Sequence, residues 1–298
     1  MLHTLKNFLK LIRWFHELVA IVPFVMLYFV INYCAQASSS SCNLSAGNFS
    51  ILCICVQLLI SAGCVLNDIA DRHIDKINKP QTHIVGNKIS LAAAKKIFAA
   101  ITILIIILSV YISVYLFKQW TFISISVYAL SVLYSLYLKK SPLFGNITIA
   151  VLASSIPLVI LFFANNCITQ LNNPKITTLI YLYSAFSFLI IVPRELSLDI
   201  SDIEGDQAGG CKTLPIVIGI KKAKQVVVAL ILLIIILSLF IMYKYNYLII
   251  TFLVVNVLLL VYLYKFNQSN TRLGYIKIGR FLWFIMIIGL IGSALSTI

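Results

Sequence analysis

The sequence predicts an all-α, polytopic membrane protein with nine transmembrane helices, and two observations support this class. Of the 298 residues, 61% are hydrophobic and only 11% are charged, and the mean hydropathy is +1.02. These values lie far outside the range of soluble globular proteins. The apolar residues also form long, unbroken runs. Because lipid cannot satisfy backbone N–H and C=O groups, such runs must be helical; barrel strands are shorter and alternate in polarity.

Nine apolar runs have close to the ~20 residues that cross a ~30 Å hydrocarbon layer. They cover residues 12–36, 46–66, 91–117, 119–138, 145–165, 176–193, 224–243, 246–264 and 280–298. The first follows a basic amphipathic lead-in and exceeds the apolar part of a signal peptide, so we expect a retained anchor. Two loops are long, residues 67–90 and 194–223, and we expect them to form a partly ordered cap.

Basic residues mark one face of the membrane. The net charge is +14, but with these spans 20 of the 23 Lys and Arg residues fall on one side, leaving Lys118, Lys175 and Lys244 on the other. The positive-inside rule then places the N-terminus in the cytoplasm and the C-terminus outside, across the inner membrane if the cell is bacterial. This distribution argues against a nucleic-acid partner, which would require a basic patch of its own. The expected surroundings are membrane lipids.

Negative charge is concentrated in two short segments. Eight of the nine acidic residues lie within residues 68–75 and 195–206, and both segments contain the pattern D-x-x-D-x-x-x-D, 131 positions apart. The paired aspartates are Asp68, Asp71 and Asp75 in the first copy and Asp199, Asp202 and Asp206 in the second. Four predicted spans separate the copies, so both face the cytoplasm. We expect one domain over residues 1–298 with an internal parallel repeat, motif 1 at 67–75 and motif 2 at 199–206.

The paired motifs predict a metal-chelated diphosphate site. If each preceding helix continues through its motif, the three aspartates point within a ~60° arc and form one acidic stripe. Carboxylates crowded in this way repel one another unless a cation lies between them. Oxygen ligands without cysteine suit Mg²⁺, which typically bridges carboxylates to phosphate oxygens. Neighbouring basic residues could bind the oxygens that the metal does not reach; they are Arg72, Lys139, Arg194 and Lys212.

Other interpretations of the acidic residues explain less. Aspartates at a membrane interface often cap helices or pair with basic neighbours, but this role does not account for three of them repeated in register. Neither segment matches the twelve-residue EF-hand pattern. A transporter would need ionisable residues along a path through the membrane, and the later spans contain almost none. The remaining acid, Glu17, lies four residues after Arg13, and we expect the two to form an i, i+4 ion pair.

The seven cysteines are scattered without a C-x-x-C pair, and Cys34, Cys42 and Cys167 fall near the outer face. A disulfide between two of these three would need an oxidising compartment. We do not expect one from the sequence.

The motifs resemble those of a known family. The run Asn67-Asp68-Ile-Ala-Asp71-Arg-His-Ile-Asp75 resembles the N-D-x-x-D-x-x-x-D motif of the UbiA superfamily of intramembrane prenyltransferases. Its second motif is similar to Asp199-x-x-Asp202-x-Glu204-Gly205-Asp206, followed by Lys212-Thr-Leu-Pro215. Further agreement occurs at Tyr134-Ser135, Leu138-Lys139 and Gly145-Asn146. With nine predicted spans, the similarity covers nearly the whole chain.

The resemblance implies helices around a central cavity, with a cytoplasmic cap that holds two Mg²⁺ ions and an isoprenyl diphosphate donor. The implied metal ligands are Asp68, Asp71, Asp75, Asp199, Asp202 and Asp206, of which Asp68, Asp71, Asp199 and Asp202 are the implied catalytic residues. The implied diphosphate-binding residues are Asn67, Arg72, Lys139, Arg194 and Lys212. A nucleophilic atom of a lipid-soluble acceptor would attack the allylic carbon as pyrophosphate departs.

Within the superfamily, residues 194–223 are most similar to digeranylgeranylglyceryl phosphate synthases. Those enzymes attach a second geranylgeranyl chain, as an ether, to geranylgeranylglyceryl phosphate. Asp71-Arg72 is also reminiscent of 4-hydroxybenzoate polyprenyltransferases, so an aromatic acceptor of the hydroxybenzoate or naphthoate type stays open. The length of the donor chain cannot be predicted, because it depends on which apolar side chains face inward.

Overall fold

The computed structural model describes residues 2–38, 42 and 44–298. In this part of the chain the fold is all-α, as predicted: fourteen α-helices and two short 3₁₀ helices. One isolated bridge joins Val85 to Ile89 in the loop that follows the first motif.

Eight helices in the described part of the chain are long and apolar enough to cross a membrane. They are α2 (Trp14–Ala37), α3 (Ala46–Ala70), α5 (Leu91–Tyr115), α7 (Phe144–Phe163), α9 (Pro174–Ser201), α12 (Ile220–Lys244), α13 (Ile249–Gln268, with η2 before it) and α14 (Arg272–Leu295). At the remaining predicted span, residues 119–138, the structure has the shorter apolar helix α6 (Trp120–Leu136). The sequence therefore predicted the positions of these helices, while eight rather than nine reach spanning length.

The outward faces of these helices are apolar. On α5, Ile106 and Val114 are 58% and 67% exposed, and on α12 Ile236 and Phe240 are 63% and 61% exposed. Side chains of this kind would be costly to leave in water. Lipid removes that cost, so the exposed faces agree with an integral, multi-pass membrane protein.

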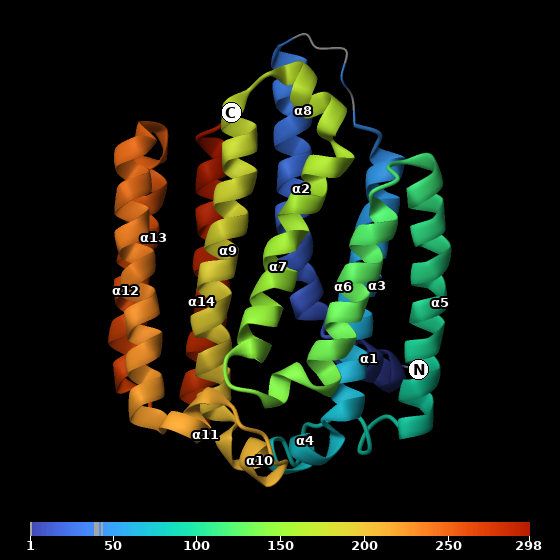
Figure 1. Ribbon diagram of the computed structural model, residues 1–298, viewed down its shortest axis with the longest axis vertical. Coiled ribbons are helices and arrows are strands. Elements are labelled where there is room, and N and C mark those ends of the chain that lie inside the picture. The colour runs from blue at the N-terminus through green and yellow to red at the C-terminus, as the bar shows by residue number, and fades with distance from the viewer. Residues whose placement is uncertain (1, 39–41, 43) are drawn as a thin grey trace. The chain divides into compact units, whose positions relative to one another are not determined.

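The chain forms two compact units, and the first carries the first motif. It comprises Met1–Ile21, Leu44–Lys140 and Glu204–Cys211. Its elements are α1 (Leu2–Leu11), the start of α2, α3, α4 (Arg72–Asn78), α5, α6, η1 (Leu138–Lys140) and most of α10 (Ile203–Ala208). Helix α3 packs against α5 and α6, which run beside it in Figure 1. Ser45 and Ser90 begin α3 and α5, each accepting a hydrogen bond from a backbone N–H of the first turn.

The second unit comprises Val22–Asn43, Ser141–Ile203 and Lys212–Ile298. It contains the rest of α2, α7, α8 (Asn165–Leu171), α9, α11 (Leu214–Ile218), α12, η2 (Asn246–Leu248), α13 and α14. Helix α9 packs against α7, α12 and α14, and α13 packs against α12 and α14. Proline interrupts the backbone hydrogen bonding of two of these helices, at Pro157 in α7 and Pro193 in α9. The hydroxyl of Ser197 donates to the carbonyl of Pro193.

The structure corrects one prediction about the cysteines. Cys42 and Cys167 form a disulfide with a Cα–Cα distance of 5.3 Å, whereas Cys34 is free. Cys167 lies in α8, at the start of α9, whose 28 residues extend ~42 Å to the second motif. The disulfide therefore belongs to the membrane face opposite that motif. The pairing could not be read from the sequence, because 125 positions separate the two cysteines.

Candidate metal and diphosphate site

Each motif breaks its helix at the second aspartate. Helix α3 ends at Ala70, Asp71 follows with φ −85° and ψ 3°, and α4 begins at Arg72. Helix α9 ends at Ser201, Asp202 follows with φ −112° and ψ 11°, and α10 begins at Ile203. Both aspartates lie near the bridge region of the Ramachandran map, where many active-site residues are found. The expectation of one continuous acidic stripe per motif is therefore wrong, because the third aspartate of each motif lies on a new, short helix.

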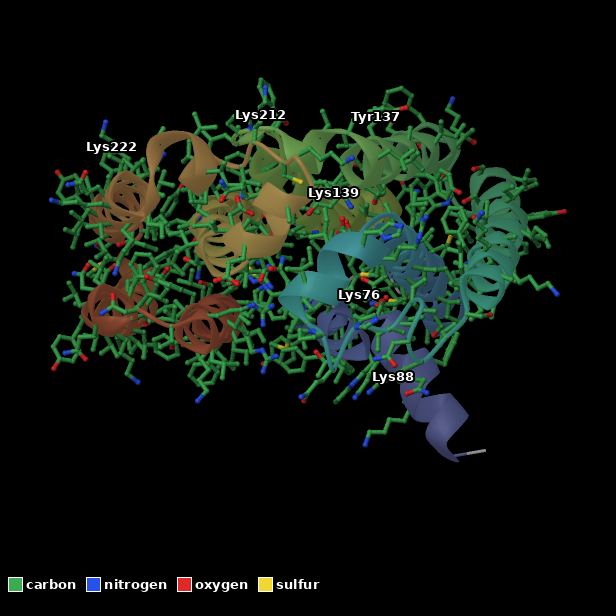
Figure 2. The ribbon with its side chains drawn as sticks, turned by 90° about the horizontal axis from the view of Figure 1, so that it is seen from below. Lys76, Lys88, Tyr137, Lys139, Lys212 and Lys222 are labelled. Atoms are coloured by element: carbon green, nitrogen blue, oxygen red, sulfur yellow. A yellow bond between two sulfur atoms is a disulfide. The ribbon has the colours of Figure 1, made fainter. Side chains whose placement is uncertain are left out.

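In the first unit, basic side chains contact every aspartate of the first motif. Arg13 Nη2 lies 2.8 Å from Asp68 Oδ1, and Lys79 Nζ lies 3.0 Å from Asp75 Oδ1. The central contact is made by Lys139, just after α6. Its Nζ lies 2.5 Å from Asp71 Oδ1 and donates to the amide oxygen of Asn67 at 3.2 Å. Figure 2 labels Lys139 among these oxygen atoms. The lysine thus joins two neighbouring turns of the motif.

Burial affects the ionisation of this cluster. Removal from water raises the pKa of Asp71 above its usual range, and the ammonium group of Lys139 opposes this rise. Burial also raises the pKa of the Cys211 thiol, with further contributions from the charges of Asp206 and Asp71. Asp206 of the second motif and Asp71 of the first therefore lie close enough to act on the same thiol.

A buried hydrogen bond attaches the second-motif segment to the first motif within this unit. The Gly205 N–H donates to Asn78 Oδ1 at 2.9 Å. A Cβ on Gly205 would lie 2.5–2.6 Å from the side-chain atoms of Asn78, so only glycine permits this approach. Residues 204–211 thereby pack on α4, and the chain brings part of the second motif to the first.

In the second unit, the first two aspartates of the second motif have partners of their own. Arg272, at the start of α14, donates to Asp202 Oδ1 through Nε at 3.2 Å and Nη2 at 2.9 Å. Asn146, in the first turn of α7, donates to Asp199 Oδ2 at 2.8 Å. The carboxylates at the end of α9 therefore face donors from two other helices.

Three predicted diphosphate-binding residues lie apart from these contacts. Arg194 is buried inside α9, pairs with Glu195 and stacks its guanidinium on Trp283 at 3.9 Å from the ring centroid. Arg72 is half-buried at the start of α4, and Lys212 is exposed. Among the predicted basic residues, Lys139 is the one for which the structure gives a direct contact with a motif aspartate.

Sequence reasoning missed four residues of this site: Arg13, Asn78, Asn146 and Arg272. Arg13 was expected to pair with Glu17, but it binds Asp68 instead, and Glu17 Oε1 accepts a hydrogen bond from Ser61 at 2.7 Å. Arg272 and Asn146 lie 70 and 53 positions from their partners, so no local spacing indicated them. The agreement with the family at Gly145-Asn146 was the one available signal.

The donor atoms of the site fit Mg²⁺. They are carboxylate oxygens and the Asn67 amide oxygen, which are hard ligands, and positive groups already face them. Within the described residues, no three acidic, histidine or cysteine side chains converge as a set of metal ligands. The contacts account for this, because basic or amide donors hold the aspartate oxygens.

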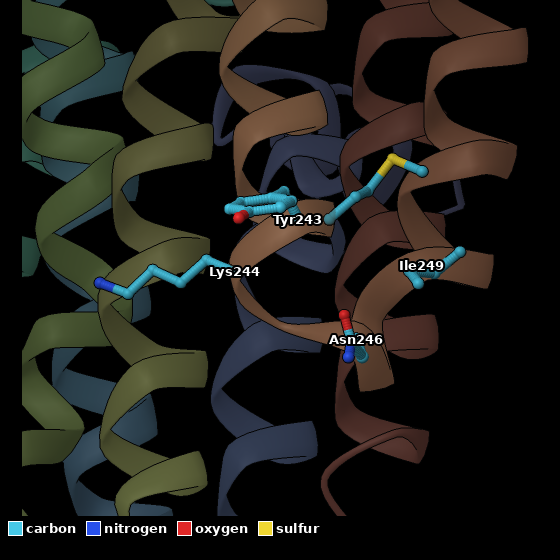
Figure 3. A pocket seen from close by; sticks show the side chains of 5 residues that line it. Tyr243, Lys244, Asn246 and Ile249 are labelled. Atoms are coloured by element: carbon cyan, nitrogen blue, oxygen red, sulfur yellow. The ribbon is translucent and has the colours of Figure 1, made fainter.

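A surface pocket of the second unit lies away from the motif. It is lined by Met242, Tyr243, Lys244, Asn246 and Ile249, at the turn between α12 and α13 (Figure 3). Arg272 and Asp202 lie at the other end of these helices. The pocket is therefore separate from the candidate site.

The fold and the two motifs define an integral membrane protein whose acidic clusters lie where spanning helices end. The model of the UbiA prenyltransferase family matches residues 20–285, and the chain belongs to this family. Digeranylgeranylglyceryl phosphate synthase of Methanobrevibacter smithii is 32% identical over 250 residues, which cover 82% of this chain and 85% of that protein.

Solved structures share the fold. A structure of digeranylgeranylglyceryl phosphate synthase in membranes has a TM-score of 0.65 and 26% identity, covering 100% of this chain and 99% of that one. A UbiA homolog from Archaeoglobus fulgidus bound to GPP and Mg²⁺ has a TM-score of 0.64 and 18% identity, covering 96% and 99%. The all-α architecture is thus that of known prenyltransferase-family structures along nearly the whole chain.

Proposed function

We propose that the protein transfers a geranylgeranyl group from its diphosphate to geranylgeranylglyceryl phosphate, in a Mg²⁺-dependent reaction that forms an ether lipid. Family membership supports prenyl transfer. The relatives named digeranylgeranylglyceryl phosphate synthase support this acceptor. The neighbour solved with GPP and Mg²⁺ supports an isoprenyl diphosphate donor and a divalent metal.

The observation that carries the proposal is the environment of the second aspartate in each motif. Asp71 and Asp202 both lie at a helix break, and each accepts from a basic side chain, Lys139 and Arg272 respectively. A carboxylate beside a cation is suited to share a metal-bound phosphate, since the carboxylate holds the metal and the cation binds phosphate oxygens. The same arrangement in both motifs favours two such positions.

The aspartates of both motifs, with Asn67, would hold two Mg²⁺ ions, which when bound neutralise the donor diphosphate. Lys139 would stabilise the negative charge that develops on pyrophosphate as its bond to the prenyl carbon breaks. Arg13 and Arg272 would act in the same way from the other aspartates. Arg72 and Lys212 are proposed as further donors to the diphosphate, whereas Arg194 would first have to leave the ring of Trp283.

We also propose that the site faces the cytoplasm, with the N-terminus inside and the C-terminus outside. The asymmetry of basic residues supports this orientation. The Cys42–Cys167 disulfide supports it independently, since it lies at the membrane face opposite the second motif and disulfides persist in oxidising compartments.

The first test uses purified protein in lipid nanodiscs with geranylgeranyl diphosphate. Geranylgeranylglyceryl phosphate and 4-hydroxybenzoate are offered together, and the products are identified by mass spectrometry. We expect an ether of the glyceryl phosphate, formed together with stoichiometric pyrophosphate, that disappears in EDTA and returns when Mg²⁺ is restored. Preferential prenylation of the aromatic acid would reassign the acceptor, and transfer undiminished in EDTA would contradict the proposal.

A further inference from the structure

The first unit contains a buried carboxylate that the diphosphate site does not use. Glu17 lies one turn into α2, within the span. Its Oε1 accepts from Ser61 Oγ at 2.7 Å, while its Oε2 is buried and has no hydrogen-bond partner in the described structure. A polar atom left in this way costs free energy, and such groups in native proteins require an explanation. An intramembrane acid is by default a candidate functional group.

A polar stripe connects Glu17 with the first motif. On α3, Gln57, Ser61, Cys64 and Asp68 follow the 4-3-4 spacing that places residues on one helix face. Cys64 lies close enough to Arg13, Glu17 and Asp68 to interact with their charges. The start of α2 faces this stripe with two contacts, Arg13 to Asp68 and Glu17 to Ser61. Polar groups thus continue below the motif, where the neighbouring positions are apolar.

The unsatisfied atoms of this stripe define the chemistry of a ligand. Besides Glu17 Oε2, the side-chain oxygen of Gln57 is buried without a partner. Both atoms are hydrogen-bond acceptors. They would repel a phosphate or carboxylate group, and they suit a ligand that donates, such as an alcohol.

The depth of Glu17 matches the position of a reacting hydroxyl. Ser61 lies seven residues before Asp68, a rise of ~10 Å along α3. A metal ligand at Asp68 would hold the diphosphate at the upper end of this interval. A metal–oxygen bond is ~2 Å, a nucleophile approaches its carbon within ~3 Å, and a general base lies within ~3 Å of the proton it takes. With the bridging atoms of the diphosphate, these lengths account for about two helical turns.

We propose that Glu17 is the general base that takes the proton from the acceptor hydroxyl, with Ser61 and Gln57 orienting the carboxylate and the alcohol. This inference rests on the proposed function and specifies its acceptor as an alcohol that reacts at oxygen. As the hydroxyl oxygen forms its bond to the prenyl carbon, the bond from that carbon to the diphosphate oxygen breaks. Pyrophosphate leaves with the electron pair, and the hydroxyl proton moves to Glu17 Oε2. The proton is then released to water, so atoms and charge balance.

The test compares wild-type protein with Glu17→Gln in nanodiscs, using geranylgeranyl diphosphate, Mg²⁺ and geranylgeranylglyceryl phosphate. Glutamine keeps the size of the side chain and its hydrogen bond but cannot take a proton. We expect kcat to fall by about 10²-fold or more, while the dissociation constant of the donor with Mg²⁺ stays unchanged. Ser61→Ala should lower kcat by about tenfold. Ser124→Ala removes another buried serine of this unit, and it should have no effect.

A second readout separates a base from a structural residue. A base becomes less important as the acceptor hydroxyl becomes more acidic. The deficit of Glu17→Gln should therefore shrink with a fluorinated glyceryl phosphate acceptor, and a packing role would leave the deficit unchanged. If Glu17→Gln does not fold, Ser61→Ala with the two acceptors gives the same comparison.

The outcomes separate this inference from the proposed function. Wild-type protein that transfers no prenyl group to any alcohol would contradict both. Wild-type transfer with an undiminished rate in Glu17→Gln, or a deficit that does not depend on the acidity of the acceptor, would overturn the role of Glu17 alone.

Discussion

At the scale of single residues, the site consists of ion pairs at the ends of helices. Most of its pairs join positions far apart in the sequence, such as Arg13 with Asp68 and Lys139 with Asp71. The aspartates could be predicted, because their spacing repeats and acids are rare elsewhere in the chain. Their partners could not, since tertiary packing selects a few of 23 basic residues. Glu17 shows the same limit: its local spacing indicated Arg13, but Arg13 binds a carboxylate on another helix.

The first prediction at this scale concerns the aspartates. Asp68→Ala and Asp202→Ala should each lower kcat/KM for geranylgeranyl transfer by at least about 10²-fold, if each anchors a metal that stabilises the leaving group. Steady-state kinetics over a range of Mg²⁺ concentrations would measure the loss. Near-normal turnover in both variants, with folding checked by gel filtration, would exclude a catalytic role for the motifs.

The second prediction concerns Lys139, whose side chain contacts Asp71 and Asn67. Lys139→Gln should weaken binding of geranylgeranyl diphosphate by about 10–100-fold, because a hydrogen bond to a charged group contributes ~1.5–3 kcal/mol. The neighbouring, exposed Lys140 provides the matched control, and Lys140→Gln should change the affinity less than threefold. Equal effects of the two substitutions would mean that only the general positive charge of this face matters.

At the scale of elements, the spans and the helix breaks differ in how far the sequence specifies them. Hydropathy predicted the positions of α3 and α9, because lipid burial depends on composition over ~20 residues. It did not predict that both helices stop at the second aspartate of a motif. A helix end depends on local backbone geometry and on the packing of α4 and α10, which single-sequence patterns do not contain.

The link between α4 and α10 gives the prediction at this scale. Gly205→Ala should lower the free energy of unfolding by ~1–3 kcal/mol, because the new methyl group would overlap the side chain of Asn78. It should also reduce Mg²⁺-dependent activity by displacing the segment that carries Asp206. Thermal unfolding in nanodiscs and the prenyl-transfer assay would measure the two effects.

Gly47→Ala is the matched control for this substitution. Gly47 lies in the first turn of α3, and the nearest atom to an added Cβ is 3.8 Å away. Alanine there should be neutral or slightly stabilising, by ~0.5–1 kcal/mol. If Gly205→Ala behaves like Gly47→Ala, the close approach to Asn78 does not contribute to stability.

At the scale of the whole molecule, the order of the chain determines which residues share a unit. Residues 204–211 belong to the first unit, although the helices on both sides of them in sequence belong to the second. The disulfide connects positions on either side of residues 44–140 in the sequence. The similarity to known structures over nearly the whole chain indicates that this chain order belongs to the fold.

The disulfide gives a prediction about stability. Cys42→Ser should lower the free energy of unfolding by ~2–4 kcal/mol, since the bond closes a long loop, and it should leave kcat nearly unchanged because the motifs lie at the other membrane face. Cys34→Ser, which removes a free thiol, should have little effect on either. If thiol labelling of the unreduced protein modifies Cys42 and Cys167, the bond does not form in the cell.

The central claim is that both motifs bind one metal–diphosphate group, and a double-mutant cycle tests it most directly. The measured quantity is kcat/KM for geranylgeranyl transfer in Asp71→Ala, Asp202→Ala and the double variant. If the aspartates act on the same diphosphate, the double variant should be within about tenfold of the weaker single variant. Losses that multiply in the double variant would mean that the two motifs act independently, which would contradict the account.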